Sequence, residues 1–207
     1  MNSKSHWNTV YETKEDNELG WYESDPVTTL DLIKKTSIAK DATILNVGAG
    51  TTTLVDALLE NGYETIIASD ISDVALQKLH SRIAKTYQYD LQCIVDDLTN
   101  SSKLSTLSNI DLWIDRAVLH FFLSEEEQVA YFDLIKKIIS PKGYVLIAVF
   151  SLEGAEKCSG LPLQRYNTEM LSERLGNQFS LVESFQHTYV NPFGGERPYI
   201  FTLFQKN

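Results

Sequence analysis

Short apolar runs alternate with amphipathic segments through the middle of the chain, between residues 26 and 150. Each apolar run is brief, which is typical of a buried strand, and the segments between them carry apolar residues at helical spacing. The pattern predicts strands at 43–47, 65–69, 91–95, 110–115 and 144–150, and helices at 25–38, 51–60, 72–86 and 124–140. Apolar strands separated by helices indicate an α/β fold, with a doubly wound sheet of five parallel strands.

Several helix boundaries carry recognisable end signals. Asp25 followed by Pro26 is typical of an N-cap and a first helical position. Ser124 precedes three glutamates, which the helix dipole favours at an N-terminus. Pro141 and Gly143 are expected to separate the fourth helix from the strand that follows it.

The pattern changes after residue 150. A helix is expected at 167–176, followed by strands at 179–190 and 197–206. Only the segment NPFGGE joins these two strands, and it is too short for a crossover helix. The last two strands are therefore expected to form an antiparallel hairpin.

Residues 1–25 form a polar arm that carries scattered aromatic side chains, namely Trp7, Tyr11, Trp21 and Tyr22. Such an arm is expected to dock onto another part of the protein. Since neither a repeat nor a flexible linker divides the sequence, residues 1–207 are expected to form a single domain. Its parts would be the arm or lid at 1–25, a ligand-binding core at 26–150 and a substrate side at 151–207.

Charge and cysteine content exclude several classes of partner. The net charge of −10 makes nucleic acid or an anionic membrane surface an improbable partner, because both recruit clustered Lys and Arg. No apolar run approaches the roughly 20 residues that span a bilayer. The N-terminus lacks a signal-type apolar stretch, and the two cysteines are too far apart to indicate a metal site. A cytoplasmic protein, as a monomer or homodimer, is the expectation.

A glycine pair marks the first strand–helix turn. Gly48 and Gly50 allow a tight turn and a close approach of a ligand to the backbone. The dinucleotide fingerprint places a third small residue where this chain has Thr53. The phosphate-loop motif of nucleoside triphosphatases is absent from the sequence.

Acidic residues follow three successive strands. Asp70 lies 20 positions beyond Gly50, the spacing at which a carboxylate reaches ribose hydroxyls. Asp96 and Asp97 end the third strand, and Asp115 ends the fourth. One such residue would be an ordinary helix cap, but three at the ligand-binding edge of the sheet predict a nucleotide-like ligand.

These segments together resemble the motifs of the class I S-adenosylmethionine-dependent methyltransferases. The matching stretches are NVGAGTT at 46–52, Asp70, DDL at 96–98 and DLWIDRAVLHF at 111–121. The resemblance spans roughly residues 20 to 207 and implies a Rossmann-like sheet of order 3-2-1-4-5-7-6. It also implies S-adenosyl-L-methionine as the cofactor. Asn46 stands where the family often has an acid, so it can accept a hydrogen bond from the methionine amino group without an ion pair.

The resemblance assigns roles around the cofactor. The glycine turn would lie under the methionine and ribose, Asp70 would bind the ribose diol, and the acids at 96–97 would contact adenine. The residues at 115–117 would line the wall near the sulfonium, and the arm would fold over it. The implied cofactor-binding set is Trp21, Asn46, Gly48, Ala49, Gly50, Thr51, Asp70, Ile71, Asp96, Asp97, Leu98, Asp115, Arg116 and Ala117.

His120 is the candidate catalytic residue. It lies just past the fourth strand, and an imidazole can titrate near neutrality and act as a general base if the acceptor arrives protonated. The alternative is that His120 packs at the strand–helix junction. Arg116 could bind an anionic acceptor or pair with a neighbouring acid, and the acidic surroundings favour the pair.

The acceptor side is expected around the loop at 156–167 and the hairpin tip. Candidate substrate contacts are Tyr22, Cys158, Arg165, Tyr166 and His187, although ordinary turn structure would also explain the loop and the tip. With one domain, a small-molecule acceptor is favoured, a protein lysine is the alternative, and nucleic acid ranks third. A nicotinamide-dependent oxidoreductase and a non-catalytic cofactor-binding module remain the alternatives from other classes. The atom methylated, whether N, O, S or a metalloid, stays open.

Overall fold

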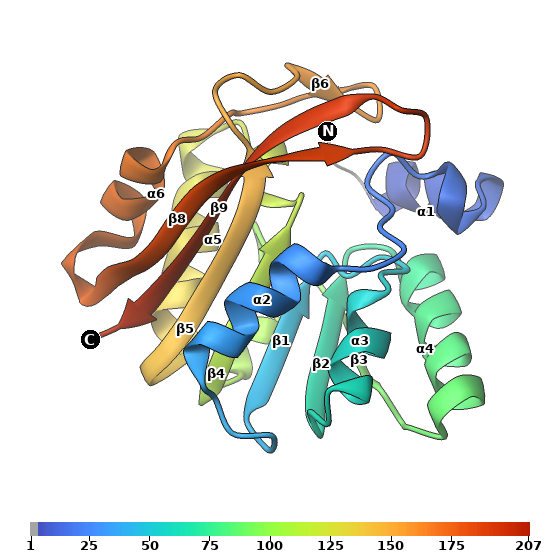
Figure 1. Cartoon of the computed structure of the whole chain (residues 1–207), viewed down its shortest axis with the longest axis horizontal. Helices are drawn as coiled ribbons and strands as arrows, with labels where there is room; N and C mark the ends of the chain where they lie inside the picture. Colours follow the sequence, from blue (N-terminus) through green and yellow to red (C-terminus); the bar gives the residue numbers. More distant parts are fainter. Residues whose placement is uncertain (1–3) are drawn as a thin grey trace.

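A mixed seven-stranded sheet forms the centre of the molecule, as Figure 1 shows for a computed structural model that describes residues 4–207. Its strands are β1 (Thr43–Val47), β2 (Thr65–Asp70), β3 (Gln92–Val95), β4 (Ile110–Arg116), β5 (Ile139–Phe150), β8 (Phe179–Val190) and β9 (Glu196–Lys206). They lie in the order β3-β2-β1-β4-β5-β9-β8. The first five run parallel, and β9 pairs antiparallel with both β5 and β8. The predicted order is confirmed, with β8 and β9 as the sixth and seventh strands of the sequence pattern.

The structure has six α-helices within residues 4–207: α1 (Lys4–Thr13), α2 (Val27–Thr36), α3 (Leu54–Glu60), α4 (Asp73–Tyr87), α5 (Glu125–Ile138) and α6 (Thr168–Leu175). Of these, α2 to α6 cover the two faces of this sheet and α1 packs on α4. Short 3₁₀ turns lie at η1 (Asp16–Glu18), η2 (Leu104–Thr106), η3 (Leu119–Phe121) and η4 (Gly176–Gln178), and a small hairpin joins β6 (Lys157–Cys158) to β7 (Leu161–Pro162). None of the helices within residues 4–207 is long and apolar enough to cross a membrane.

The core consists of two apolar layers, because successive residues of a strand point to opposite faces. On β4, Ile114 packs in the layer under α2, α3 and α4, whereas its neighbour Trp113 packs in the layer under α5 and α6. The same division separates Ile44 from Leu45 on β1. All four side chains are completely buried. The apolar strand runs of the sequence are therefore explained by burial on both faces.

The structure corrects several predicted boundaries; for example, the helix predicted at 51–60 begins at Leu54. Pro26 occupies the N-cap position of α2 without a side-chain cap, so the helix begins at Val27 and Asp25 lies outside the cap. β5 begins at Ile139 rather than at 144, because Ile139 already pairs with Ile110 of β4. The register shifts just beyond that pair, around Pro141, which lacks the amide hydrogen that a regular ladder needs. The predicted cap of α5 is present, since Ser124 accepts a hydrogen bond from the Glu127 amide.

The N-terminal arm contains a helix that the sequence pattern did not predict. α1 lies at the N-terminal end of α4, where the Asn8 side-chain amide donates to Asp73 (2.8 Å) and accepts from the Ser72 hydroxyl (2.7 Å). The Lys78 ammonium donates to the Tyr11 carbonyl at 2.6 Å. These bonds hold the arm against the edge of the sheet at which the parallel strands end (Figure 1).

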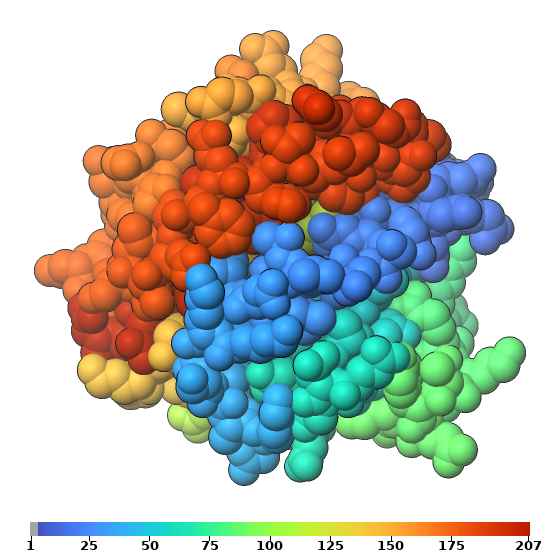
Figure 2. Space-filling model, in the orientation of Figure 1, coloured from blue at the N-terminus to red at the C-terminus, as the bar shows by residue number. Residues whose placement is uncertain are grey.

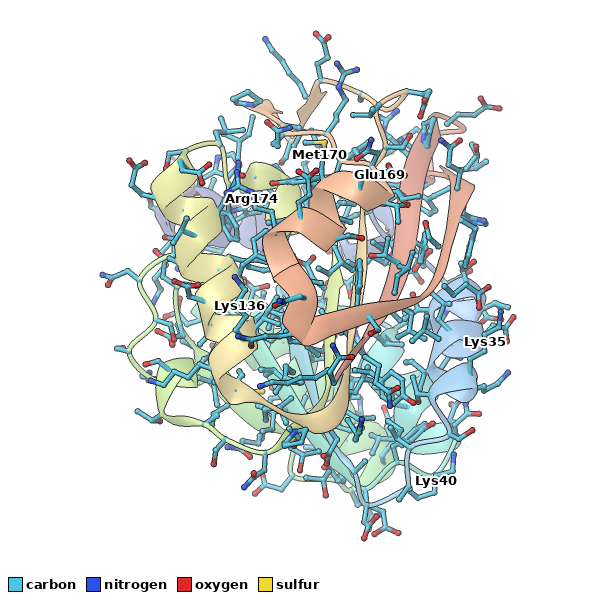
Figure 3. All side chains as sticks on the ribbon, turned by 90° about the vertical axis from the view of Figure 1, so that its left-hand side faces the viewer. Lys35, Lys40, Lys136, Glu169, Met170 and Arg174 are labelled. Carbon is cyan, nitrogen blue, oxygen red and sulfur yellow. The ribbon has the colours of Figure 1, made fainter. Side chains whose placement is uncertain are left out.

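The C-terminal hairpin closes the other side of that edge. In Figure 2 the orange-red hairpin meets the blue N-terminal segment, and the Tyr189 hydroxyl donates a hydrogen bond to the Tyr22 carbonyl. At the opposite end of the hairpin, α6 packs beside α5, where Arg174 forms an ion pair with Glu125 (Figure 3). The arm and the hairpin therefore enclose the space above β1, β2 and β4.

We expect Ile114→Ala to lower the free energy of unfolding by about 2–5 kcal/mol, because it opens a cavity beneath a completely buried strand. Val129→Ala is the matched control, since Val129 is 43% exposed on α5 and its truncation should change stability by no more than about 0.5 kcal/mol. Urea unfolding followed by circular dichroism measures both. Equal losses for the two variants would contradict the two-layer core.

Candidate functional site

Two adjoining cavities lie at the carboxyl ends of the parallel strands. The larger has a volume of about 170 Å³ and the smaller about 40 Å³. Trp21, Gly48 and Arg116 line both, so the two cavities meet at the first strand–helix turn and at the end of β4. This is the edge at which open α/β sheets bind their ligands.

The glycine turn is required by its surroundings as well as by its backbone. Gly48 has φ +55°, and a Cβ there would lie 2.0 Å from a methyl carbon of Val118. Gly50 has φ +53°, and its Cβ would lie 2.2 Å from the Tyr11 hydroxyl. No other residue fits either position without displacing a neighbour. Gly48 lines both cavities, so the turn presents its backbone to them there, whereas Tyr11 covers Gly50.

Asp70 lies between the glycine turn and α4. Its carboxylate accepts hydrogen bonds from the Gly50 and Ser72 amides, both at 2.8 Å. Burial raises its pKa to about 6, against the effect of these hydrogen bonds. Each carboxylate oxygen still has a free lone pair, so Asp70 can accept hydrogen bonds from a ligand that enters the larger cavity. Ile71, the next residue, lines the same cavity.

The two acids after β3 differ in their surroundings. Asp96 accepts hydrogen bonds from the amides of residues 102–104 and from the Ser101 hydroxyl, so it organises the loop before η2. Burial is the largest single effect on the Asp96 carboxyl and acts to raise its pKa. The hydrogen bonds together have the greater effect, so the pKa of Asp96 is lowered. Asp97 uses one oxygen for the Thr99 amide and hydroxyl, at 2.8 and 2.7 Å. Both acids and Leu98 line the larger cavity. Asp97 accepts fewer hydrogen bonds than Asp96, and both of them go to one of its two oxygens.

Asp115 lines neither cavity, contrary to its expected place near the sulfonium. Its carboxylate is completely buried and accepts hydrogen bonds from the Val118 and Leu119 amides, both at 3.0 Å. The Tyr131 hydroxyl donates a third bond at 2.7 Å. Burial raises the pKa of Asp115 to about 6. Asp115 therefore caps the turn after β4 and positions the residues that follow it.

Arg116 joins three segments of the chain. Its guanidinium donates to the Trp21 carbonyl at 2.8 Å and pairs with Glu23 at 2.9 Å, the neighbouring-acid alternative that the sequence favoured. It also lies over the rings of Tyr189 and Tyr199 in the hairpin, 4.9 and 5.7 Å from their centroids. Arg116 thereby holds the arm and the hairpin at the end of β4, where it lines both cavities.

His120 lines the larger cavity and is completely buried. Its ring lies 4.5 Å from the Phe121 centroid and 5.0 Å from that of Phe150. Neither ring nitrogen has a hydrogen-bond partner within the described chain. Burial lowers the pKa of His120 to about 3, and the charge of Arg116 adds to this effect. The expectation that His120 titrates near neutrality is therefore wrong: the imidazole is neutral, with both nitrogens available to a ligand.

The expected substrate contacts separate into two groups. Cys158 lines the larger cavity and Tyr22 the smaller one, whereas Arg165, Tyr166 and His187 line neither. Arg165 holds the loop after β5 by donating to the Leu152 carbonyl at 2.9 Å. Tyr166 is buried beneath α5 and α6, and His187 packs edge-on against Phe201 of the hairpin. Arg165, Tyr166 and His187 therefore lie outside both cavities and contact other parts of the protein.

Other lining residues were absent from the sequence-based site. Trp7 and Tyr11 of α1, together with Phe121 and Phe122 after β4, line the larger cavity. The Trp7 ring contacts those of Trp21 and Phe121, at centroid distances of 5.7 and 5.1 Å. The spacing of four between Trp7 and Tyr11 places them on one helix face, and it was the available signal. The strained backbone of Ala117, with φ +72°, also lies at this wall and had no sequence signal.

The smaller cavity fits the methionine end of S-adenosylmethionine. The side-chain oxygen of Asn46 is buried there without a hydrogen-bond partner among the described residues. An unpaired buried acceptor is costly, and an ammonium group would satisfy it. Ala49 and Thr51 complete the same wall, whereas Gly50 lies beneath Tyr11 and lines neither cavity. Across residues 4–207, no group of three His, Cys, Asp or Glu side chains is arranged to hold a metal ion.

Sequence similarity agrees with this geometry. Residues 38–187, well over half of the chain, match the family model described as a methyltransferase domain. EEF1A lysine methyltransferase 2 from Homo sapiens is 25% identical over 160 residues, covering 71% of this chain and 67% of the relative. The protein of the same name from Mus musculus is 25% identical over 174 residues, covering 75% and 68%.

Solved structures share the fold at lower identity. A structure described by the conversion of a disulfide bond into a thioacetal group during echinomycin biosynthesis matches with a TM-score of 0.77, 16% identity and coverage of 99% and 93%. N-methyltransferase NodS from Bradyrhizobium japonicum, in complex with S-adenosyl-L-homocysteine, matches with a TM-score of 0.68, 14% identity and coverage of 97% and 98%. The chain belongs to the class I S-adenosylmethionine-dependent methyltransferase family.

Proposed function

We propose that this protein transfers the methyl group of S-adenosylmethionine to a small molecule that binds beside His120. The observation that supports the proposal is the larger cavity, which Asp70 and the acids after β3 line together with His120 and Cys158. Residues expected on the cofactor side and residues expected on the acceptor side therefore border the same space, as transfer between two bound molecules requires.

Different residues would contact the different parts of the cofactor and the acceptor. When bound, S-adenosylmethionine supplies an electrophilic methyl group on a positively charged sulfur. Asp70 would accept hydrogen bonds from the ribose, and Asn46 would accept one from the methionine ammonium. The Trp21 ring lines both cavities and offers an aromatic face to a positive charge. Since the leaving group is already good, His120 has only to orient the acceptor by a hydrogen bond to one of its unpaired ring nitrogens.

A second candidate is methylation of a protein lysine, which the two curated relatives favour. Their names identify them as lysine methyltransferases, and each is 25% identical to this chain. Cofactor carrying a labelled methyl group, incubated with separate pools of small metabolites and of proteins, distinguishes the candidates. Label in small molecules supports the first and label in protein the second, while absence of S-adenosylhomocysteine binding by calorimetry would refute both.

We expect Asp70→Asn to weaken S-adenosylhomocysteine binding by about 10- to 150-fold, because hydrogen bonds to a charged group contribute about 1.5–3 kcal/mol. Asp31→Asn is the control, because the Asp31 carboxylate is exposed on α2 and pairs with Lys34 of the same helix, and this variant should leave the affinity unchanged. Isothermal titration calorimetry measures both, and thermal unfolding checks that each variant folds. Unchanged affinity in a folded Asp70→Asn protein would remove Asp70 from the cofactor site.

We also expect the affinity for S-adenosylhomocysteine to fall as the pH drops below about 6, because protonation removes an acceptor from Asp70, whose pKa burial raises to about 6. Stability should move in the opposite direction. The raised pKa values of Asp70 and Asp115 favour the protonated native state, so their contribution is present below about pH 4 and is lost as the pH rises through 6. Isothermal titration calorimetry of S-adenosylhomocysteine binding between pH 5 and 8 tests the affinity prediction. An identical pH dependence of the affinity in Asp70→Asn would contradict it.

A further inference from the structure

The charged side chains on the lining of the larger cavity are predominantly acidic. Within residues 4–207 they are the carboxylates of Asp70, Asp96, Asp97 and Glu127 and the guanidinium of Arg116. Three of these carboxylates accept hydrogen bonds from backbone amides, and such bonds stabilise the negative charge rather than remove it. Negative charges therefore exceed positive ones by three on this lining.

The positive charge of Arg116 is matched by an acid that does not line the larger cavity. Its guanidinium pairs with Glu23 at 2.9 Å, and Glu23 lines the smaller cavity instead. The Arg116 Nε has no partner among the described residues, and Arg116 lines the smaller cavity together with Asn46. Since that cavity fits the methionine end of the cofactor, the methionine carboxylate can accept the Nε hydrogen bond. Arg116 thus leaves the acidic excess of the larger cavity in place.

Two of the lining carboxylates have an oxygen without a hydrogen bond from the described chain. Asp97 accepts both of its bonds, from Thr99, at Oδ1. Glu127 accepts the amides of residues 123 and 124 at Oε2, each at 3.0 Å. Asp97 Oδ2 and Glu127 Oε1 therefore remain available to a hydrogen-bond donor that enters the cavity.

A further carboxylate lies behind the turn that carries His120. Asp115 is completely buried and accepts the Val118 and Leu119 amides, both at 3.0 Å, and Leu119 directly precedes His120. In a narrow space with low-dielectric walls, charges of one sign concentrate their electric field on the interior. The His120 end of the cavity is therefore also a favourable place for positive charge.

His120 supplies an independent observation. Its side chain is completely buried on this lining, and neither ring nitrogen has a partner within the described residues. The imidazole is neutral at pH 7, so one of its nitrogens carries a lone pair that accepts a hydrogen bond. An amine can donate an N–H to that nitrogen, whereas a carboxylate has no proton to donate. The rings of Trp21 and Phe121 on the same lining can also attract a cation.

We propose that the methyl acceptor is a primary or secondary amine, which enters the larger cavity as an ammonium ion and is methylated on its nitrogen. This inference rests on the proposed function and names the substrate class of the same site. The ammonium ion first loses one proton to water, a loss that the positive sulfonium beside it favours. The nitrogen lone pair then forms the bond to the methyl carbon, and the carbon–sulfur bond breaks with its electron pair on sulfur. An N–H donated to His120 fixes the direction of the lone pair, and the product leaves as a methylated ammonium ion.

A pool of small metabolites, incubated with the protein and methyl-labelled S-adenosylmethionine, tests the inference before the acceptor is identified. We expect the labelled product to be retained on a cation exchanger at pH 7, and fragmentation in a mass spectrometer to place the methyl group on nitrogen. Label in neutral or anionic products, or on oxygen, sulfur or carbon, would overturn the amine inference while methyl transfer stands.

Three probes with one phenylethyl scaffold test the charge preference: phenethylamine, 2-phenylethanol and 3-phenylpropanoate. We expect phenethylamine to bind the S-adenosylhomocysteine complex with a Kd at least about tenfold below those of the other two, because the lining attracts the ammonium ion and repels the carboxylate. Isothermal titration calorimetry measures all three. Equal binding of the three, preference for the alcohol or the acid, or binding of none would overturn the inference.

Glu127→Gln removes a lining charge and keeps an oxygen that can accept the amides of residues 123 and 124. We expect it to weaken phenethylamine binding about threefold or more, without weakening 3-phenylpropanoate binding, because it reduces the negative charge of the cavity. Glu126→Gln is the matched control, since it removes the same charge from an exposed side chain at the preceding position of α5, outside both cavities. Thermal unfolding checks that both variants fold. Equal losses for the amine and the acid in Glu127→Gln would indicate a structural effect and overturn the inference.

These outcomes are distinguishable from failure of the proposed function. Failure to bind S-adenosylhomocysteine would refute methyl transfer itself, whichever probe is used. Label that enters protein lysines and no small molecule would refute the small-molecule acceptor while nitrogen remains the methylated atom.

Discussion

The ion pair between Arg116 and Glu23 is the interaction on which the closed site depends. Both side chains are largely buried, with exposures of 13% and 15%, and the pair joins the end of β4 to the N-terminal arm. Arg116 also lies over Tyr189 and Tyr199, so the same guanidinium holds the hairpin. Burial raises the pKa of Glu23 despite its partner, so the pair lies in a low-dielectric region where its electrostatic interaction is strong. Arm, strand and hairpin thus meet at one cation, with the two cavities on either side.

The strand-end acids of this acidic protein have a structural role as well as a place at the site. The sheet supplies its strand-end acids to the cavity edge, but the backbone amides of the following turns bind most of them. Hydrogen bonds of this kind give the turns their geometry, and they leave fewer acceptors for a ligand. On the cavity lining, Asn46 Oδ1, Arg116 Nε and the two His120 nitrogens are buried and unpaired among the described residues, which is the condition under which a ligand gains most from binding them.

The strand pattern, the sheet order and the position of the glycine turn could be predicted from the sequence, because apolar runs and turn residues are local signals. The roles of the acids at the strand ends could not be predicted from the sequence. Asp70 ends β2 and Asp115 is the last residue but one of β4, yet Asp70 lines the cavity and Asp115 is enclosed beneath Tyr131. Asp115 lies on the same face of β4 as Trp113, because alternate residues of a strand point to the same side, and that face is covered by α5. α1 was missed for a related reason, since its sequence is polar and it is held by α4 rather than by a strong apolar face of its own.

The sequence by itself determined the class of fold and the family, because spacing between glycines, acids and apolar strands places them at one edge of a parallel sheet. Only the tertiary structure decided which of those groups remain available to a ligand. Availability depends on neighbours far away in the chain: Tyr11 over Gly50, Glu23 on Arg116, and the hairpin beside His120. The charge, burial and free lone pairs of the site are therefore properties of packing, which no local spacing in the sequence contains.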